Sequence, residues 1–145
     1  MTDLQERVIA EARSWMGTPY RHQASLMGVG SDCLGLVRGV WRGIYGAEPE
    51  ALKPYSADWA EAGGADALLE AARRNFIQKP IFDLADGDVI LFRWKPSHAA
   101  KHLGILVSEH SFIHAYEGHS VMISALVPQW RSRIAAVFSF KPLKD

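Results

Sequence analysis

The sequence predicts an α+β fold with N-terminal helices packed on a C-terminal antiparallel β-sheet. Apolar residues in the first half of the chain recur at helical spacing, whereas five short runs rich in Val, Ile and Phe follow in the second half. Helices followed by strands are typical of domains whose helices cover one face of an antiparallel sheet. The length of 145 residues suits one domain, so we expect residues 1–145 to form a single unit.

The first predicted helix lies close to the N-terminus. Thr2 and Gln5 have the spacing of a capping box and predict its start, and Gly17 followed by Pro19 predicts its end. Its apolar face would consist of Leu4, Val8, Ala12 and Trp15.

A loop, 20–31, separates this helix from a second one, which we expect to begin near Asp32 and to end at Gly46. Glycine recurs every four residues along this second helix, and small residues permit close packing against a neighbouring element. These glycines are Gly35, Gly39 and Gly43. The buried face would consist of Leu36, Val37, Val40, Trp41 and Ile44.

The alanine-rich segment 47–75 predicts a third helix after Gly64. Its inward-facing residues would be Leu68, Leu69 and Ala72. From Phe76 onward the character changes, and the turn Asp86-Gly87-Asp88 starts the first strand. The five predicted strands are DVILFRW, LGILVS, SFIHAY, SVMISAL and IAAVFSF.

Composition excludes several classes of protein. Sixteen basic residues balance sixteen acidic ones, which argues against a nucleic-acid-binding protein or a polybasic membrane anchor. A single cysteine cannot form an intramolecular disulfide. The N-terminus lacks the apolar region of a secretory signal, and no apolar run is long enough to span a membrane. We therefore expect synthesis in the cytoplasm without a signal peptide.

Three residues predict thiol chemistry. Cys33 lies at the predicted start of the second helix, where unpaired N–H groups favour a thiolate. His102 opens one strand and His114 lies in the next, so a hairpin would bring them together. The backbone N–H of Cys33 and the hydroxyl of Tyr20 are candidate oxyanion donors. Asp32 is interpreted as a helix cap, and we also place it with Tyr20 among the candidate oxyanion and substrate-binding residues.

Each of these residues also has a structural interpretation. A lone cysteine is often a small buried hydrophobe, and a histidine in a strand is often structural. The histidines pair at a spacing of four, which suits a metal site on a helix but loses that meaning in loops and strands. These pairs are His98 with His102 and His110 with His114. Periodicity alone leaves the function open.

Several motifs, in this order along the chain, resemble the NlpC-type cell-wall peptidases, which are small relatives of papain. GTPYRHQ and SDCLGLV resemble the family's entry loop and nucleophile motif, and LADGDVILF resembles the stretch leading into its first core strand. KHLGILV and FIHA are similar to its two histidine-bearing strands. The resemblance implies a papain-like fold, with Cys33 as nucleophile, His102 as base, His114 as the orienting residue and Tyr20 near the oxyanion. It implies hydrolysis of peptidoglycan stem peptides, typically between D-glutamate and the diamino acid, without a metal or organic cofactor.

Leu34 departs from the family pattern, because serine usually follows the nucleophile there. DCLGLVRGVW resembles a phage-associated subgroup, which includes proteins of gene-transfer-agent-like particles. This resemblance implies that a phage-like tail carries the enzyme to the periplasm, with tail-tip or baseplate proteins as partners. Loops 20–31 and 96–101 would contact the stem peptide, through Arg21, His22, His98 and Lys101. Two alternatives stay open: a non-catalytic component of a tail tip, and a thiol amidase or acyltransferase on the same fold.

Overall fold

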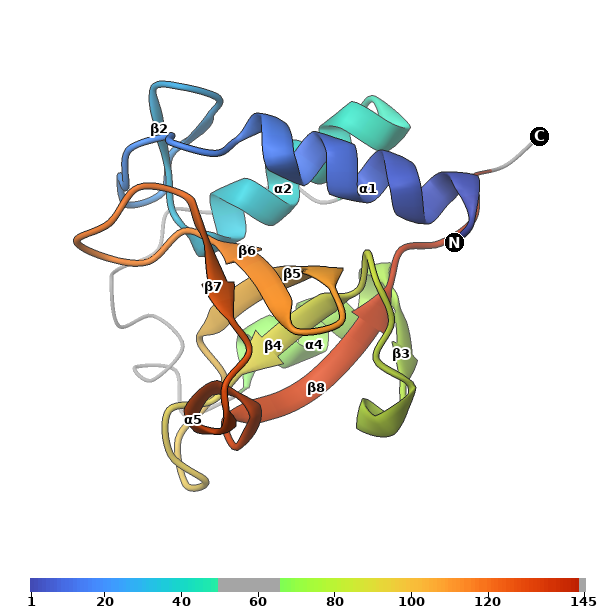
Figure 1. Cartoon of the computed structure of the whole chain (residues 1–145), viewed down its shortest axis with the longest axis vertical. Helices are drawn as coiled ribbons and strands as arrows, with labels where there is room; N and C mark the ends of the chain where they lie inside the picture. The colour runs from blue at the N-terminus through green and yellow to red at the C-terminus, as the bar shows by residue number, and fades with distance from the viewer. Residues whose placement is uncertain (50–65, 144–145) are drawn as a thin grey trace.

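The computed structural model describes residues 1–49 and 66–143, and within them the predicted α+β order is confirmed (Figure 1). The helices are α1 (Asp3–Ser14), α2 (Cys33–Tyr45), α4 (Ala67–Asn75) and the short α5 (Pro128–Arg131), with a 3-10 turn η1 (Ile81–Asp83). The strands are β1 (Ser25–Leu26), β2 (Gly30–Ser31), β3 (Ile77–Lys79), β4 (Val89–Phe92), β5 (His102–Ser108), β6 (Ser111–His114), β7 (Met122–Ala125) and β8 (Ile134–Ser139). The part of the alanine-rich segment that spans residues 50–65, including Gly64, lies outside the described residues.

Local signals in the sequence account for the helix ends. The Thr2 hydroxyl accepts a hydrogen bond from the Gln5 amide at 3.1 Å, and the Gln5 side chain accepts one from the Thr2 amide at 2.7 Å, which confirms the capping box. Gly46 ends α2 with φ of 91°, a conformation that glycine adopts without strain. Helices α1 and α2 therefore begin and end close to where the sequence predicts.

Six strands form one antiparallel sheet in the order β3-β8-β4-β5-β6-β7. All five predicted strands are present in it, although the observed β4, β6 and β7 are shorter than their sequence runs. The sequence prediction missed β3, α5 and the β1–β2 hairpin, which lies inside the segment expected to be a loop. These elements are two to four residues long, too short to show a periodic pattern.

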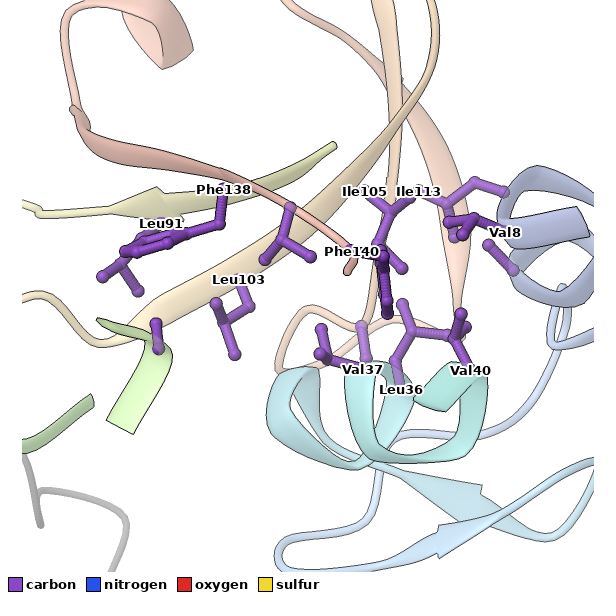
Figure 2. Packing of buried hydrophobic residues seen from close by; sticks show 14 of the residues in the cluster. Val8, Leu36, Val37, Val40, Leu91, Leu103, Ile105, Ile113, Phe138 and Phe140 are labelled. Carbon is purple, nitrogen blue, oxygen red and sulfur yellow. The ribbon is translucent and has the colours of Figure 1, made fainter. Parts of the chain in front are cut away.

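Both faces of the central strands are buried. On one face, α2 packs its apolar side against the sheet and against α1 (Figure 2). The labelled residues of this core are Val8, Leu36, Val37, Val40, Leu91, Leu103, Ile105, Ile113, Phe138 and Phe140. On the other face, a smaller cluster around Phe92 and Phe112 is covered by Trp130 near the end of α5. Trp41 of the predicted helix face is half-buried, because it lies at the rim of the main core.

The three glycines of α2, Gly35, Gly39 and Gly43, form a glycine row that lies very close to neighbouring parts of the chain, as the sequence predicts. A Cβ atom at Gly35 would lie 1.9 Å from the carbonyl oxygen of Ala24, and one at Gly39 would lie 2.0 Å from the Trp15 ring. One at Gly43 would meet only the carboxylate end of Glu11, at 2.4 Å. The small residues thus let α2 approach both α1 and the chain before the β1–β2 hairpin. No helix in the described ranges is both long and apolar enough to cross a membrane.

Alanine substitutions at Gly39 and Gly43 distinguish the effect of close packing on stability from the effect of helix propensity. Gly39→Ala drives a methyl group into the buried Trp15 ring and should lower the free energy of unfolding by about 1–3 kcal/mol. Gly43→Ala displaces only a flexible carboxylate and gains helix propensity, so it should be neutral or stabilising by up to about 1 kcal/mol. Urea denaturation of both variants measures the difference. Equal effects at the two positions would contradict the close contact between α1 and α2.

Candidate active site

Asp32 fixes the start of α2. It is the N-cap residue, is only 4% exposed, and its Oδ1 accepts a hydrogen bond from the Gly35 amide at 2.7 Å. Its Oδ2 accepts one from the Gln23 amide, also at 2.7 Å. Asp32 is therefore a helix cap, as one of its two interpretations predicted. Because its carboxylate is buried and binds backbone amides, it acts on the site through Cys33 and the preceding loop.

Tyr20 lies beside the strand that leads into Cys33. The Arg21 amide donates to the Ser31 carbonyl at 3.2 Å and the Ser31 amide donates to the Pro19 carbonyl at 2.9 Å, which holds Tyr20 next to Ser31. Burial, together with smaller effects of the neighbouring Cys33, Asp32 and Glu117, raises the pKa of the Tyr20 hydroxyl to about 12. The hydroxyl is thus protonated at neutral pH and able to donate a hydrogen bond.

The thiol of Cys33 lies against the start of β5. Its Sγ is 3.9 Å from the carbonyl oxygen of Lys101, and the backbone N–H of Leu103 faces it as well. The thiol therefore contacts the backbone on both sides of His102. Among the described hydrogen bonds, none joins Sγ directly to the His102 ring.

The structure differs from the sequence prediction in the protonation of this thiol. Burial, and then the negative charge of Asp32, raise the pKa of Cys33 to about 12. The N–H groups at the helix start, those of Cys33 and Leu34, lower the pKa as predicted, but desolvation outweighs them. In the resting protein the thiol is neutral.

His102 and His114 form a buried pair across β5 and β6, which confirms their predicted approach. The Nε2 atom of His102 is 2.8 Å from Nδ1 of His114, and Nε2 of His114 is 2.8 Å from Oγ of Ser124 on β7. Burial, and to a lesser extent His114, lower the pKa of His102 to about 3. Burial also lowers the pKa of His114 to about 4, with a smaller effect of His119. Both rings are neutral at neutral pH, and the nitrogen of His102 outside this bond is Nδ1.

Aromatic side chains surround the histidine pair. Trp94 stacks on His102 with ring centroids 5.5 Å apart, and Tyr116 meets the same ring edge-on at 5.6 Å. Trp130 lies 5.7 Å from His102 and 5.3 Å from His114. None of these three residues was predicted from the sequence to belong to the site. Side chains alternate between the two faces of a β-strand, so Tyr116, two residues after His114, could have been expected on the same face as that histidine. Trp130 follows β7, and no such spacing relates it to the histidines.

The remaining candidate residues lie around this centre. Arg21 and His22 are exposed, whereas His98 and Lys101 are partly buried. The ion pair between Arg93 and Asp66, 2.8 Å long, and a bond from the Ala100 amide to Asp66 hold the segment that leads into His102. The hydrogen bond from Ala100 ties loop 96–101, one of the two loops predicted to contact substrate, to Asp66.

The histidines spaced four residues apart lie in bends, turns and strands of the structure. In the part of the chain that the structure describes, no group of three or more His, Cys, Asp or Glu side chains is arranged to hold a metal ion. His110 lies exposed in the turn between β5 and β6, whereas His114 is buried and bonded to His102 and Ser124. The interval of four residues spans a turn and a strand, which explains why it does not bring these two rings together.

The structure is thus an α+β domain in which a thiol at the start of a helix packs on an antiparallel sheet that carries a histidine pair. Within the class of α+β domains, the chain belongs to the NlpC/P60 family, whose model matches residues 17–138.

Curated relatives of this family include hydrolases of known activity. The chain is 29% identical over 132 residues to the murein DD-endopeptidase MepS/murein LD-carboxypeptidase of Escherichia coli K12, covering 90% of this chain and 60% of that protein. It is 31% identical over 140 residues to the gamma-DL-glutamyl hydrolase of Bacillus subtilis 168, covering 94% of this chain and 29% of that protein. The chain therefore spans less than two thirds of either relative.

Solved structures support the fold. An NlpC/P60 family protein from Bacillus cereus superposes with a TM-score of 0.68 at 19% identity, covering 95% of this chain and 40% of that one. The NlpC/p60 domain of the peptidoglycan hydrolase SagA superposes with a TM-score of 0.64 at 21% identity, covering 94% and 98%. The peptidoglycan hydrolase RipB of Mycobacterium tuberculosis gives 0.65 at 20% identity, covering 97% and 66%. These likenesses establish the α+β architecture.

The buried histidines should make the fold sensitive to acid. The unfolded chain binds a proton at each of them near pH 6.5, whereas the folded chain does so only near pH 3 to 4, so stability is lost as the pH falls through this window. His114→Gln should reduce the slope of unfolding free energy against pH by roughly one proton between pH 4.5 and 6. His110→Gln, on the exposed turn, is the matched control and should keep the wild-type slope. Denaturant titrations across this range measure the slopes, and equal slopes for the two variants would contradict the burial of a neutral pair.

Proposed function

We propose that this chain is a cysteine endopeptidase that hydrolyses amide bonds in the peptide stems of peptidoglycan. The observation that carries the proposal is the convergence of Cys33 with the backbone flanking His102, next to the His102–His114 pair. Membership of the NlpC/P60 family and the murein and glutamyl hydrolases among its relatives support the substrate class.

The geometry suggests how the residues divide the chemistry. Because Nε2 of His102 is bonded to His114, the Nδ1 atom of His102 takes the thiol proton while Sγ of Cys33 attacks the carbonyl carbon. With the pKa of the thiol near 12 and that of His102 near 3, the proton leaves only as the sulfur–carbon bond forms. The Cys33 amide and the protonated Tyr20 hydroxyl stabilise the oxyanion.

The second half of the reaction uses the same groups. The His102 imidazolium gives its proton to the leaving amine, and a thioester on Cys33 remains. Water then loses a proton to His102 and attacks the thioester carbonyl, and the departing sulfur recovers that proton. His114 keeps the His102 ring oriented throughout, in the manner of the third member of a catalytic triad.

For the bond cut, we propose the one between D-glutamate and the diamino acid of the stem. The gamma-DL-glutamyl hydrolase among the relatives supports this choice, whereas the E. coli relative is a DD-endopeptidase and LD-carboxypeptidase. These three activities release different fragments, so analysis of products distinguishes them.

Digestion of purified Gram-negative sacculi tests the activity. The wild-type chain should release stem fragments cut at the D-glutamyl bond, and Cys33→Ala should lose at least about 10³-fold in rate because the nucleophile is absent. His110→Gln, far from the thiol in sequence and exposed, should digest like the wild type. Mass spectrometry of the released muropeptides identifies the bond.

Three outcomes of this digestion would contradict the proposal. Full activity of Cys33→Ala would remove the thiol from the mechanism. Intact sacculi with folded wild-type protein would favour a structural tail component. Transfer of the acyl group to an added amine in place of water would favour the acyltransferase.

We also propose that a phage-like tail carries the enzyme to the periplasm, with tail-tip or baseplate proteins as its partners. The resemblance of residues 32–41 to the phage-associated subgroup supports this delivery. In a strain that produces such particles, quantitative mass spectrometry should find the chain enriched with the tail proteins after density-gradient purification. Its recovery only in the fractions without particles would overturn the proposed route.

A further inference from the structure

A chain of two hydrogen bonds runs across three neighbouring strands at the candidate site. It begins at His102 on β5, passes through both ring nitrogens of His114 on β6, and ends at the Ser124 hydroxyl on β7, with both bonds 2.8 Å long. β7 is an edge strand of the sheet, and Ser124 is half-buried there. The relay therefore joins a buried imidazole to a partly exposed hydroxyl.

We propose that Ser124 is a positioning residue that sets the tautomer of His114 and, through it, leaves Nδ1 of His102 free of a proton. The inference rests on the proposed role of His102 as the base. Ser124 itself contacts His114 and acts on the reaction only through the two rings.

Counting protons along the relay gives two possible arrangements. Each hydrogen bond needs one donor and one acceptor, and each neutral imidazole carries a single N–H. If Ser124 donates to Nε2 of His114, the proton of His114 is on Nδ1 and points to His102. The proton of His102 must then be on its own Nδ1, the nitrogen that is needed as the base.

The second arrangement has the opposite direction. When Ser124 accepts from Nε2–H of His114, Nδ1 of His114 accepts from Nε2–H of His102, and Nδ1 of His102 keeps its lone pair. The hydroxyl of Ser124 has two lone pairs, and its partial exposure lets its own proton bind water at the edge of the sheet. Ser124 thus serves as the acceptor that ends the relay in the direction general-base catalysis requires.

The ring tautomers can be measured directly by ¹⁵N NMR of the substrate-free protein near pH 7. In the wild type we expect both rings to carry their proton on Nε2. In Ser124→Ala, Nε2 of His114 loses its acceptor, so both rings should show signals of mixed tautomers. Ser124→Thr keeps the hydroxyl and should restore the wild-type spectrum.

Kinetic measurements on the same variants provide a second test of the positioning role. Ser124→Ala should lower kcat by roughly 10–100-fold with KM unchanged. Loss of a group that fixes the tautomer and orientation of a functional histidine has effects of that size. Ser124→Thr should recover most of the rate. Ser111→Ala, a serine-to-alanine change on the neighbouring strand β6, is the matched control and should leave both spectrum and rate unchanged.

The results that overturn the inference are Nδ1–H tautomers in the wild type, or Ser124→Ala with wild-type tautomers and rate. The NMR measurement needs no substrate, so it is independent of the proposed function. If the wild type leaves sacculi intact but Ser124→Ala still mixes the tautomers, the proposed activity fails and the positioning role of Ser124 stands.

Discussion

The two oxygens of the Asp32 carboxylate determine the geometry on which the candidate site depends. One caps α2 at the Gly35 amide, and the other holds the amide of Gln23, whose φ of 65° is unusual for a residue other than glycine. The same buried group therefore orders the helix that carries Cys33 and the loop that follows Tyr20. This arrangement has an electrostatic cost, because the negative charge of Asp32 raises the pKa of the adjacent thiol.

Burial gives the site a neutral resting state in place of the thiolate that a helix N-terminus favours. Desolvation disfavours every charged form, so it raises the pKa of Cys33 and lowers the pKa of His102. The aromatic rings of Trp94, Tyr116 and Trp130 line the histidine pair and remove it from water. A neutral thiol and a neutral imidazole need no stabilising counter-charge in the folded protein, and the proposed mechanism confines charge separation to the moment of reaction.

The features of this protein that can be predicted from the sequence depend on residues close together along the chain. The capping box at Thr2, the cap at Asp32 and the glycine row on α2 depend on neighbours within a few residues, and the structure confirms each of them. Protonation of the thiol depends instead on how deeply the folded chain buries it, which spacing does not reveal. The bond from His114 to Ser124 depends on the register of β6 and β7, in which Phe112 pairs with Ser124. Elements as short as β1 and β2 carry no period to detect.

Leu34, which follows Cys33 on α2, has a packing role. Leu34 is half-buried against the main core and lines an apolar pocket with Leu68, Phe76 and Leu103. Its side chain therefore packs where a serine would offer a hydroxyl, while its backbone N–H still faces the thiol. Since relatives with different target bonds match most of this chain, the shared core does not select the bond. In the proposed function, selection of the bond therefore falls to the loops around Cys33.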